Sequence, residues 1–173
     1  INEYNTKELL LQKIYDEKIE IDCDTPLENL GFGNLVDQLY KKVARPNVVN
    51  PIFLTEHPIS LSPLARANDD NPEITDRFQL IINGAEIINA YSELVDPQEQ
   101  ERRLEEQAAL KADGDEEAMP MDHEYISAME VGMPPISGWG MGIDRVVQLL
   151  TNSDNIKDVI LFPLMRPLNE EKK

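Results

Sequence analysis

An Asn-Gly pair between two apolar runs constrains this chain more than any other feature. The pair is Asn83-Gly84, and residues 77–82 and 85–93 flank it. A two-residue type I′ turn needs positive φ at both positions, which asparagine and glycine adopt readily, so the sequence predicts a β-hairpin. Regular pairing from this turn would give four cross-strand pairs: Ile82–Ala85, Ile81–Glu86, Leu80–Ile87 and Gln79–Ile88.

Strict alternation would divide the polar residues of this hairpin between its two faces. One face would carry Gln79, Ile81, Glu86 and Ile88, and the other would carry Ile87, Asn89, Tyr91 and Glu93. Polar side chains in an apolar strand need a partner or a ligand, unless they mark the solvent-exposed face of an edge strand. If Glu86 and the 89–93 set serve one ligand cavity, alternation must fail between them, most simply through a bulge near Ile87 or Ile88.

A second feature is the run of alternating glycines near the C-terminus, Gly138, Gly140 and Gly142. Apolar residues at helical spacing follow it from residue 143 to 150, so the glycines are expected where an extended segment turns into a helix. Such a junction lets a ligand approach the backbone, and the first amides of a helix attract anions. Arg145 lies in the first turn, where the helix dipole disfavours a cation, which indicates an anionic ligand. The alternative is a surface ion pair with Asp144 or Asp158.

The rest of the chain alternates predicted helices with loops and short strands. We expect helices over residues 5–20 with Thr6 as the cap, from Thr25 to Gly31, from Asn34 to Pro46, from Asp96 toward Lys111 on the surface, and over 123–130. Strands are expected at 52–55 and 158–162. His57 is interpreted as structural, because the adjacent Glu56 would point to the opposite face of a strand.

The composition limits the partners and the compartment that can be expected for this chain. The 173 residues carry a net charge of −17, from 33 acidic and 16 basic residues, and such a surface repels phosphate backbones. The single Cys23 excludes an internal disulfide and fits a reducing cytoplasm. No apolar run approaches the roughly 20 residues of a membrane span, and no leader is apparent. The first residue is Ile1 rather than methionine, which suggests a piece of a longer protein.

The pattern Gly140-x-Gly142-x-x-Arg145 resembles motif 3 of the class II aminoacyl-tRNA synthetases. Longer stretches in the same order resemble the lysyl-tRNA synthetases among them: residues 55–58, 62–66, 71–78, 86, 89–94, 114–119, 161–163 and 165–167. The resemblance implies an α+β fold, an antiparallel sheet with flanking helices. It implies a helical segment of the catalytic domain at 1–50 and the C-terminal portion of the catalytic core, including motif 3, at 51–173.

Carried over to this sequence, the resemblance also implies a set of site residues. Asn89, Tyr91 and Glu93 would contact the substrate lysine, with Gly140 bordering its pocket. Gly142 would border the adenine of ATP, and Arg145 would be the catalytic residue that meets ATP. Glu86 would bind ATP through Mg²⁺. Gln79 would be the second metal-binding residue, but here the chain departs from the family pattern, in which a carboxylate is expected. The neutral amide still offers an oxygen to the metal, with one negative charge lost.

The implied activity is ATP-dependent activation of lysine and its ligation to tRNA(Lys), by a cytoplasmic enzyme that is a homodimer when complete. No anticodon-binding barrel, motif 1 or motif 2 is found here, so tRNA contacts are expected from other parts and the fragment alone is expected to be inactive. Two alternatives stay open. One is a non-catalytic, synthetase-like binding module, and the other is a ligase that attaches lysine to a protein.

Overall fold

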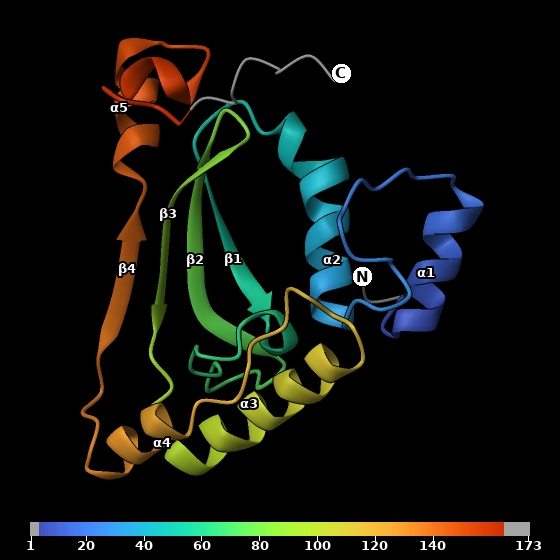
Figure 1. The fold of residues 1–173 in the computed structure, drawn as a ribbon, viewed down its shortest axis with the longest axis vertical. Coiled ribbons are helices and arrows are strands. Elements are labelled where there is room, and N and C mark those ends of the chain that lie inside the picture. Colours follow the sequence, from blue (N-terminus) through green and yellow to red (C-terminus); the bar gives the residue numbers. More distant parts are fainter. Residues whose placement is uncertain (1–3, 165–173) are drawn as a thin grey trace, which may run out of the picture.

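The computed structural model describes residues 4–164 and confirms an α+β architecture (Figure 1). A four-stranded antiparallel sheet has the order β1 (Ile52–Pro58), β2 (Ile74–Ile82), β3 (Ala85–Ser92) and β4 (Ser137–Met141). The helices are α1 (Lys7–Asp16), α2 (Phe32–Leu39), α3 (Pro97–Ala112), α4 (His123–Glu130) and α5 (Ile143–Thr151). In Figure 1, α3 and α4 cross one end of the sheet, while α5 continues from β4 at the other end.

The hairpin forms at the predicted turn, but its register shifts after two pairs. Asn83 and Gly84 both have positive φ, at 49° and 69°, as the turn requires. The pairs Ile82–Ala85 and Ile81–Glu86 are confirmed, whereas Leu80 pairs with Ile88 and Gln79 with Asn89. The predicted pairs Leu80–Ile87 and Gln79–Ile88 are therefore wrong.

The cause of the shift is a β-bulge at Ile87, as the shared-cavity hypothesis required. The side chain of Ile87 is buried, and its backbone carbonyl accepts the amide hydrogen of Gly142 at 3.1 Å. A contact with a later part of the chain thus holds the extra residue in place. As a result Glu86, Asn89 and Tyr91 share the face of the sheet that carries Gln79.

The start of α2 is bonded to one buried carboxylate. Thr6 caps α1 as predicted, but no helix forms between Thr25 and Gly31, and Gly31 begins α2 instead of ending a helix. Asn34 lies inside α2 rather than capping it. The reason is Asp115, which accepts hydrogen bonds from the Gly31 amide at 2.7 Å and the Asn34 side chain at 2.9 Å, so a distant carboxylate satisfies the start of α2.

Helices α3 and α4, at one end of the sheet, form at the predicted positions. Asp96 caps α3 through the amides of residues 98 and 99, and α4 has the predicted bounds 123–130. Although α3 is mostly polar, Gln100, Arg103 and Leu104 are buried. Arg103 donates to the Ala65 carbonyl at 2.8 Å, so this helix is anchored to the loop before β2 by polar contacts.

The chain after α5 differs from the prediction. Residues 156–159 form a 3-10 turn instead of the start of a strand, and Leu161 and Phe162 are about nine-tenths exposed. A strand needs a neighbouring strand to satisfy its backbone, and no described segment pairs with these residues. The family match at 165–167 lies outside the described residues.

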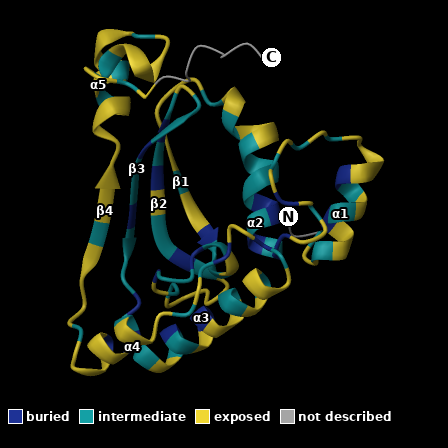
Figure 2. Ribbon diagram, viewed as in Figure 1, coloured by how far each residue is buried: buried dark blue, intermediate teal, exposed yellow. Residues whose placement is uncertain are grey.

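The buried residues lie where the sheet and helices pack together. In Figure 2 the buried residues gather around the sheet and where α2 meets its neighbours, whereas α5 has none. The first hydrophobic cluster joins α1 and α2 through five side chains: Leu10, Ile14, Leu30, Leu35 and Val36. The second joins α3 and α4 through Leu104, Ile126 and Met129. Among the described residues, no helix has both the length and the apolar character to cross a membrane.

Candidate functional site

The predicted site residues on β2 and β3 lie along one face of the sheet. Glu86 lies beside the hairpin turn, Asn89 and Tyr91 follow along β3, and Glu93 comes directly after this strand. At about 3.3 Å per residue this row extends over roughly 20 Å, long enough for a ligand of several chemical groups. Its two ends differ in chemistry.

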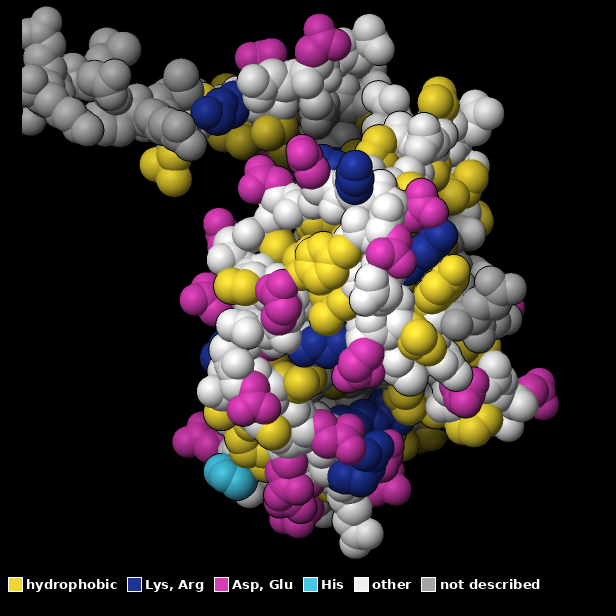
Figure 3. Space-filling view, turned by 90° about the vertical axis from the view of Figure 1, so that its right-hand side faces the viewer, with side chains coloured by type: hydrophobic (Ala, Val, Ile, Leu, Met, Phe, Trp, Pro, Cys, Tyr) yellow, Lys and Arg dark blue, Asp and Glu magenta, His cyan; other side chains and the backbone are white. Residues whose placement is uncertain are grey.

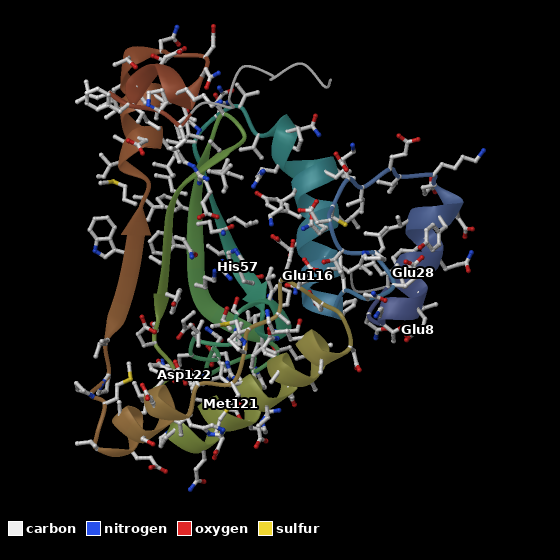
Figure 4. All side chains as sticks on the ribbon, viewed as in Figure 1. Glu8, Glu28, His57, Glu116, Met121 and Asp122 are labelled. Atoms are coloured by element: carbon white, nitrogen blue, oxygen red, sulfur yellow. The ribbon has the colours of Figure 1, made fainter. Side chains whose placement is uncertain are left out.

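The end beside the turn contains a hydrogen-bonded chain of three side chains. Gln79 Nε2 donates to Glu86 Oε2 at 2.5 Å, and Gln79 Oε1 lies 3.3 Å from His57 Nε2. His57 belongs to β1 and lies beside β2 (Figure 4). An ionised carboxylate only accepts hydrogen bonds, so the amide nitrogen of Gln79 faces Glu86 and its oxygen faces His57. With the amide in this orientation, a hydrogen bond between His57 and Gln79 requires the hydrogen on His57 Nε2.

His57 is buried, and its surroundings disfavour the charged imidazolium. Burial lowers the pKa of His57, and the positive charge of Arg77 lowers it further. Its other ring nitrogen, Nδ1, is buried without a hydrogen-bond partner among the described residues. This residue was expected to be structural, and the hydrogen bond to Gln79 adds a link to the site that no sequence signal indicated.

The middle of the row holds Asn89 and Tyr91 together with Arg77, which sequence reasoning missed. Arg77 Nε donates to Asn89 Oδ1 at 3.0 Å, and Arg77 Nη1 donates to the hydroxyl of Ser62 at 2.9 Å. These residues line a cleft of about 180 Å³. Burial, and then the negative charge of Glu93, raises the pKa of the Tyr91 hydroxyl. The sequence did offer a signal for Arg77, since it is the one basic residue of β2.

Glu93 is held next to β4 at the far end of the row. Its backbone amide donates to the Ile136 carbonyl at 3.0 Å, and burial raises the pKa of its carboxyl group. It lines a second cleft, of about 510 Å³, with Arg66 and residues 135–137 among others. Tyr91 lines the other cleft, yet it lies near enough for the charge of Glu93 to raise the pKa of its hydroxyl.

The glycine that makes room for Glu93 is Gly138. A Cβ atom there would lie 2.5 Å from Glu93 Oε1, whereas a Cβ atom on Gly140 would have nothing within 4 Å. Gly140 pairs with Asn89 across the sheet, so it remains beside the predicted site. Sequence reasoning missed Gly138, although it belongs to the same alternating run.

Arg145 joins the start of α5 to the Glu86 end of the row. Gly142 is the N-terminal cap of α5, and Arg145 Nη1 donates to the backbone carbonyl of Glu86 at 2.6 Å. The alternative ion pairs with Asp144 or Asp158 do not form in the described part of the chain. A Cβ atom on Gly142 would lie 3.2 Å from Arg145 Cδ, so this glycine gives the arginine side chain space.

The same end offers one carboxylate to a metal ion. The described residues contain no group of three or more His, Cys, Asp or Glu side chains that could hold a metal. Glu86 is accompanied by the neutral amide of Gln79, whose nitrogen is bonded to it. Mg²⁺ is often bound through one or two carboxylates together with substrate phosphates. The residues present therefore fit a cation that arrives with most of its ligands.

Comparisons with known proteins agree with this architecture. A family model described as tRNA synthetases class II (D, K and N) matches residues 4–166. The lysine–tRNA ligase of Enterobacter sp. (strain 638) is 53% identical over 138 residues, which are 80% of this chain and 27% of that protein. The heat-inducible lysine–tRNA ligase of Escherichia coli K12 is 53% identical over 137 residues, 79% of this chain and 27% of that protein.

A more extended match comes from Hahella chejuensis, whose lysine–tRNA ligase is 49% identical over 153 residues, 88% of this chain. This chain spans 27–30% of the length of these relatives. The family match nonetheless covers both the helical N-terminal segment and the sheet. The chain therefore belongs to the class II tRNA synthetases (D, K and N).

Proposed function

We propose that this chain is a C-terminal portion of the catalytic domain of a lysine–tRNA ligase, which activates lysine with ATP and transfers it to tRNA(Lys). The observation that carries this proposal is the bulge at Ile87, because it brings Glu86 to the same face as Asn89 and Tyr91. An ATP end and an amino-acid end can then share one continuous surface. Identity near 50% to lysine–tRNA ligases supports the choice of lysine among the amino acids.

The amino-acid end is proposed to hold lysine through Asn89, Tyr91 and Glu93, with Gly140 at its border. A carboxylate can bind the lysine ammonium group, and a tyrosine ring can pack on the side-chain methylenes. Burial raises the pKa of Glu93, so its charged form is disfavoured in the absence of a cation. A bound ammonium group would supply the missing partner.

The ATP end is proposed to consist of Arg145, Gly142 and Glu86. Arg145 would stabilise negative charge while the lysine carboxylate attacks the α-phosphate, and the protein would contribute orientation rather than covalent catalysis. Gly142 would leave room for the adenine. Mg²⁺ bound with ATP would neutralise phosphate charge and would be held by Glu86, with Gln79 offering at most a neutral oxygen.

Other parts of the complete protein are proposed to bind the tRNA. Acidic side chains are spread over the face of the molecule shown in Figure 3, in keeping with a net charge of −17. Such a surface repels a phosphate backbone. We further propose that segments 1–50 and 51–173 both belong to the catalytic domain, and that the complete protein is a cytoplasmic homodimer.

Lysine-dependent exchange of pyrophosphate into ATP tests the proposal. The 173-residue chain is expected to show no exchange, because losing half of a preorganised site should abolish turnover. A protein extended upstream should be active. Exchange by the short chain alone would contradict the assignment as a portion of a catalytic domain. Transfer of labelled lysine to protein but not to tRNA would identify a protein ligase instead.

A further inference from the structure

The hydrogen-bonded chain of His57, Gln79 and Glu86 has a directionality that limits what Glu86 can bind. Gln79 lies between the two other residues and uses both ends of its amide, with its nitrogen on the carboxylate and its oxygen toward the imidazole. His57 is 4% exposed and Gln79 is 9% exposed, so their contact is shielded from water, whereas the contact of Gln79 with half-buried Glu86 is shielded only in part. The orientation of the amide is therefore fixed by its two neighbours.

This orientation turns a donor, not a lone pair, toward any cation beside Glu86. For the oxygens of Gln79 and Glu86 to face one cation, the amide would have to turn over. Its NH₂ group would then meet His57 Nε2, which carries a hydrogen, and two buried donors would oppose each other. The conflict disappears only if His57 moves its hydrogen to Nδ1, the buried nitrogen that has no partner among the described residues.

We propose that His57, acting through Gln79, closes the Glu86 carboxylate to free divalent cations, so that a cation binds here only when it arrives with further ligands of its own. Gln79 occupies Oε2 of the carboxylate, and His57 is the positioning residue that keeps the amide of Gln79 from turning over. The nucleotide is the source of these further ligands, which rests on the proposed function. The closure of Glu86 is independent of the proposed function, because it concerns the protein without nucleotide.

Binding of Mn²⁺ alone to the 173-residue chain, followed by electron paramagnetic resonance without nucleotide, tests the closure. The acidic surface will bind Mn²⁺ weakly in every variant, so differences between variants carry the information. The unaltered chain and Glu86→Gln should bind alike, within about twofold. Gln79→Glu supplies a second carboxylate and should bind at least about tenfold more tightly, a gain that the double variant with Glu86→Gln should lose.

Gln98→Glu is the matched control, because it adds the same charge at an exposed position on α3. The proposal is overturned if Glu86→Gln alone lowers Mn²⁺ affinity tenfold, if Gln79→Glu gains nothing, or if Gln98→Glu gains as much. Circular dichroism establishes that each variant is folded. Failure of pyrophosphate exchange in a longer protein would count against the proposed function and would leave these outcomes unchanged.

Nuclear magnetic resonance of the unaltered chain provides a measurement that does not depend on any variant folding. The imidazole nitrogen shifts of His57 should report hydrogen on Nε2, and excess Mg²⁺ alone should leave the side-chain NH₂ signals of Gln79 unchanged. A hydrogen on Nδ1 would overturn the positioning role of His57. A saturable shift of the Gln79 signals that Glu86→Gln abolishes would overturn the closure.

Discussion

Replacing Gly138 by alanine should weaken lysine recognition without disturbing the sheet. The added Cβ would lie 2.5 Å from Glu93 Oε1, while ordinary van der Waals contact begins near 3.4 Å, so the carboxylate must move by about 1 Å. Gly138 is not among the glycines with positive φ, so alanine fits the backbone there. Glu93 can yield because the clash involves the end of a flexible side chain.

The size of the effect follows from the contact that would be lost. A charge-assisted contact contributes about 1.5–3 kcal/mol, so complete loss would weaken lysine binding by roughly ten- to a hundredfold, and a partial shift by less. The assay is pyrophosphate exchange by the complete protein, with the Michaelis constants for lysine and ATP measured separately. Only the constant for lysine should rise.

Gln98→Ala is the control, because Gln98 is exposed on α3 and lies outside the proposed site. It should leave both Michaelis constants within about twofold, since substitutions that create no clash have small effects. The reasoning is refuted if the two alanine variants weaken lysine binding equally, or if Gly138→Ala weakens ATP binding as much as lysine binding.

Three further predictions concern titratable side chains. Glu93→Gln should weaken lysine binding in the complete protein by about 1.5–3 kcal/mol, measured by calorimetry, and equal losses for ATP would mean that Glu93 supports the fold. Asp115→Ala should lower the free energy of unfolding of this chain by about 3 kcal/mol in urea titrations, because it leaves the buried Gly31 amide unsatisfied, while exposed Asp113→Ala should change it by less than about 0.5 kcal/mol. Folding lowers the pKa of His57, so its imidazole should begin to take up a proton only below pH 6.5. The contribution of His57 to stability is then present above pH 6.5 and is lost as the pH falls through the folded-state pKa. A titration of the imidazole nitrogens with a midpoint at or above pH 6.5 would contradict this.

Structural features that depend on residues close in the sequence were predictable from the sequence. The Asn83-Gly84 turn, the Asp96 cap and the helix at 123–130 form as expected, because each is stabilised by hydrogen bonds within a few residues. The start of α2 was not predictable, since its amides bond to Asp115, which is far away in the sequence. The predicted strand at 158–162 failed for a related reason, because a strand requires a partner that local sequence does not supply.

In the candidate site, too, the local pattern predicted part of the arrangement and contacts with distant residues decided the rest. Alternation from the turn correctly placed Gln79 and Glu86 on one face, and they are hydrogen-bonded. The need for a bulge could be stated from the sequence, but its position at Ile87 depends on the contact with Gly142. Arg77 and Gly138 were missed because their roles arise from cross-strand neighbours rather than from a motif.

The bulge also means that the hairpin turn alone does not decide which residues face the ligand. The same turn permits a regular pairing without a bulge, in which Asn89 and Tyr91 would move to the opposite face. Within the hairpin, the hydrogen bond from Arg77 to Asn89 favours the observed register. The other contacts come from Gly142 and Arg145, which are synthesised after the hairpin is complete. The arrangement of the binding face is therefore fully stabilised only once the last strand and the start of α5 have joined the sheet.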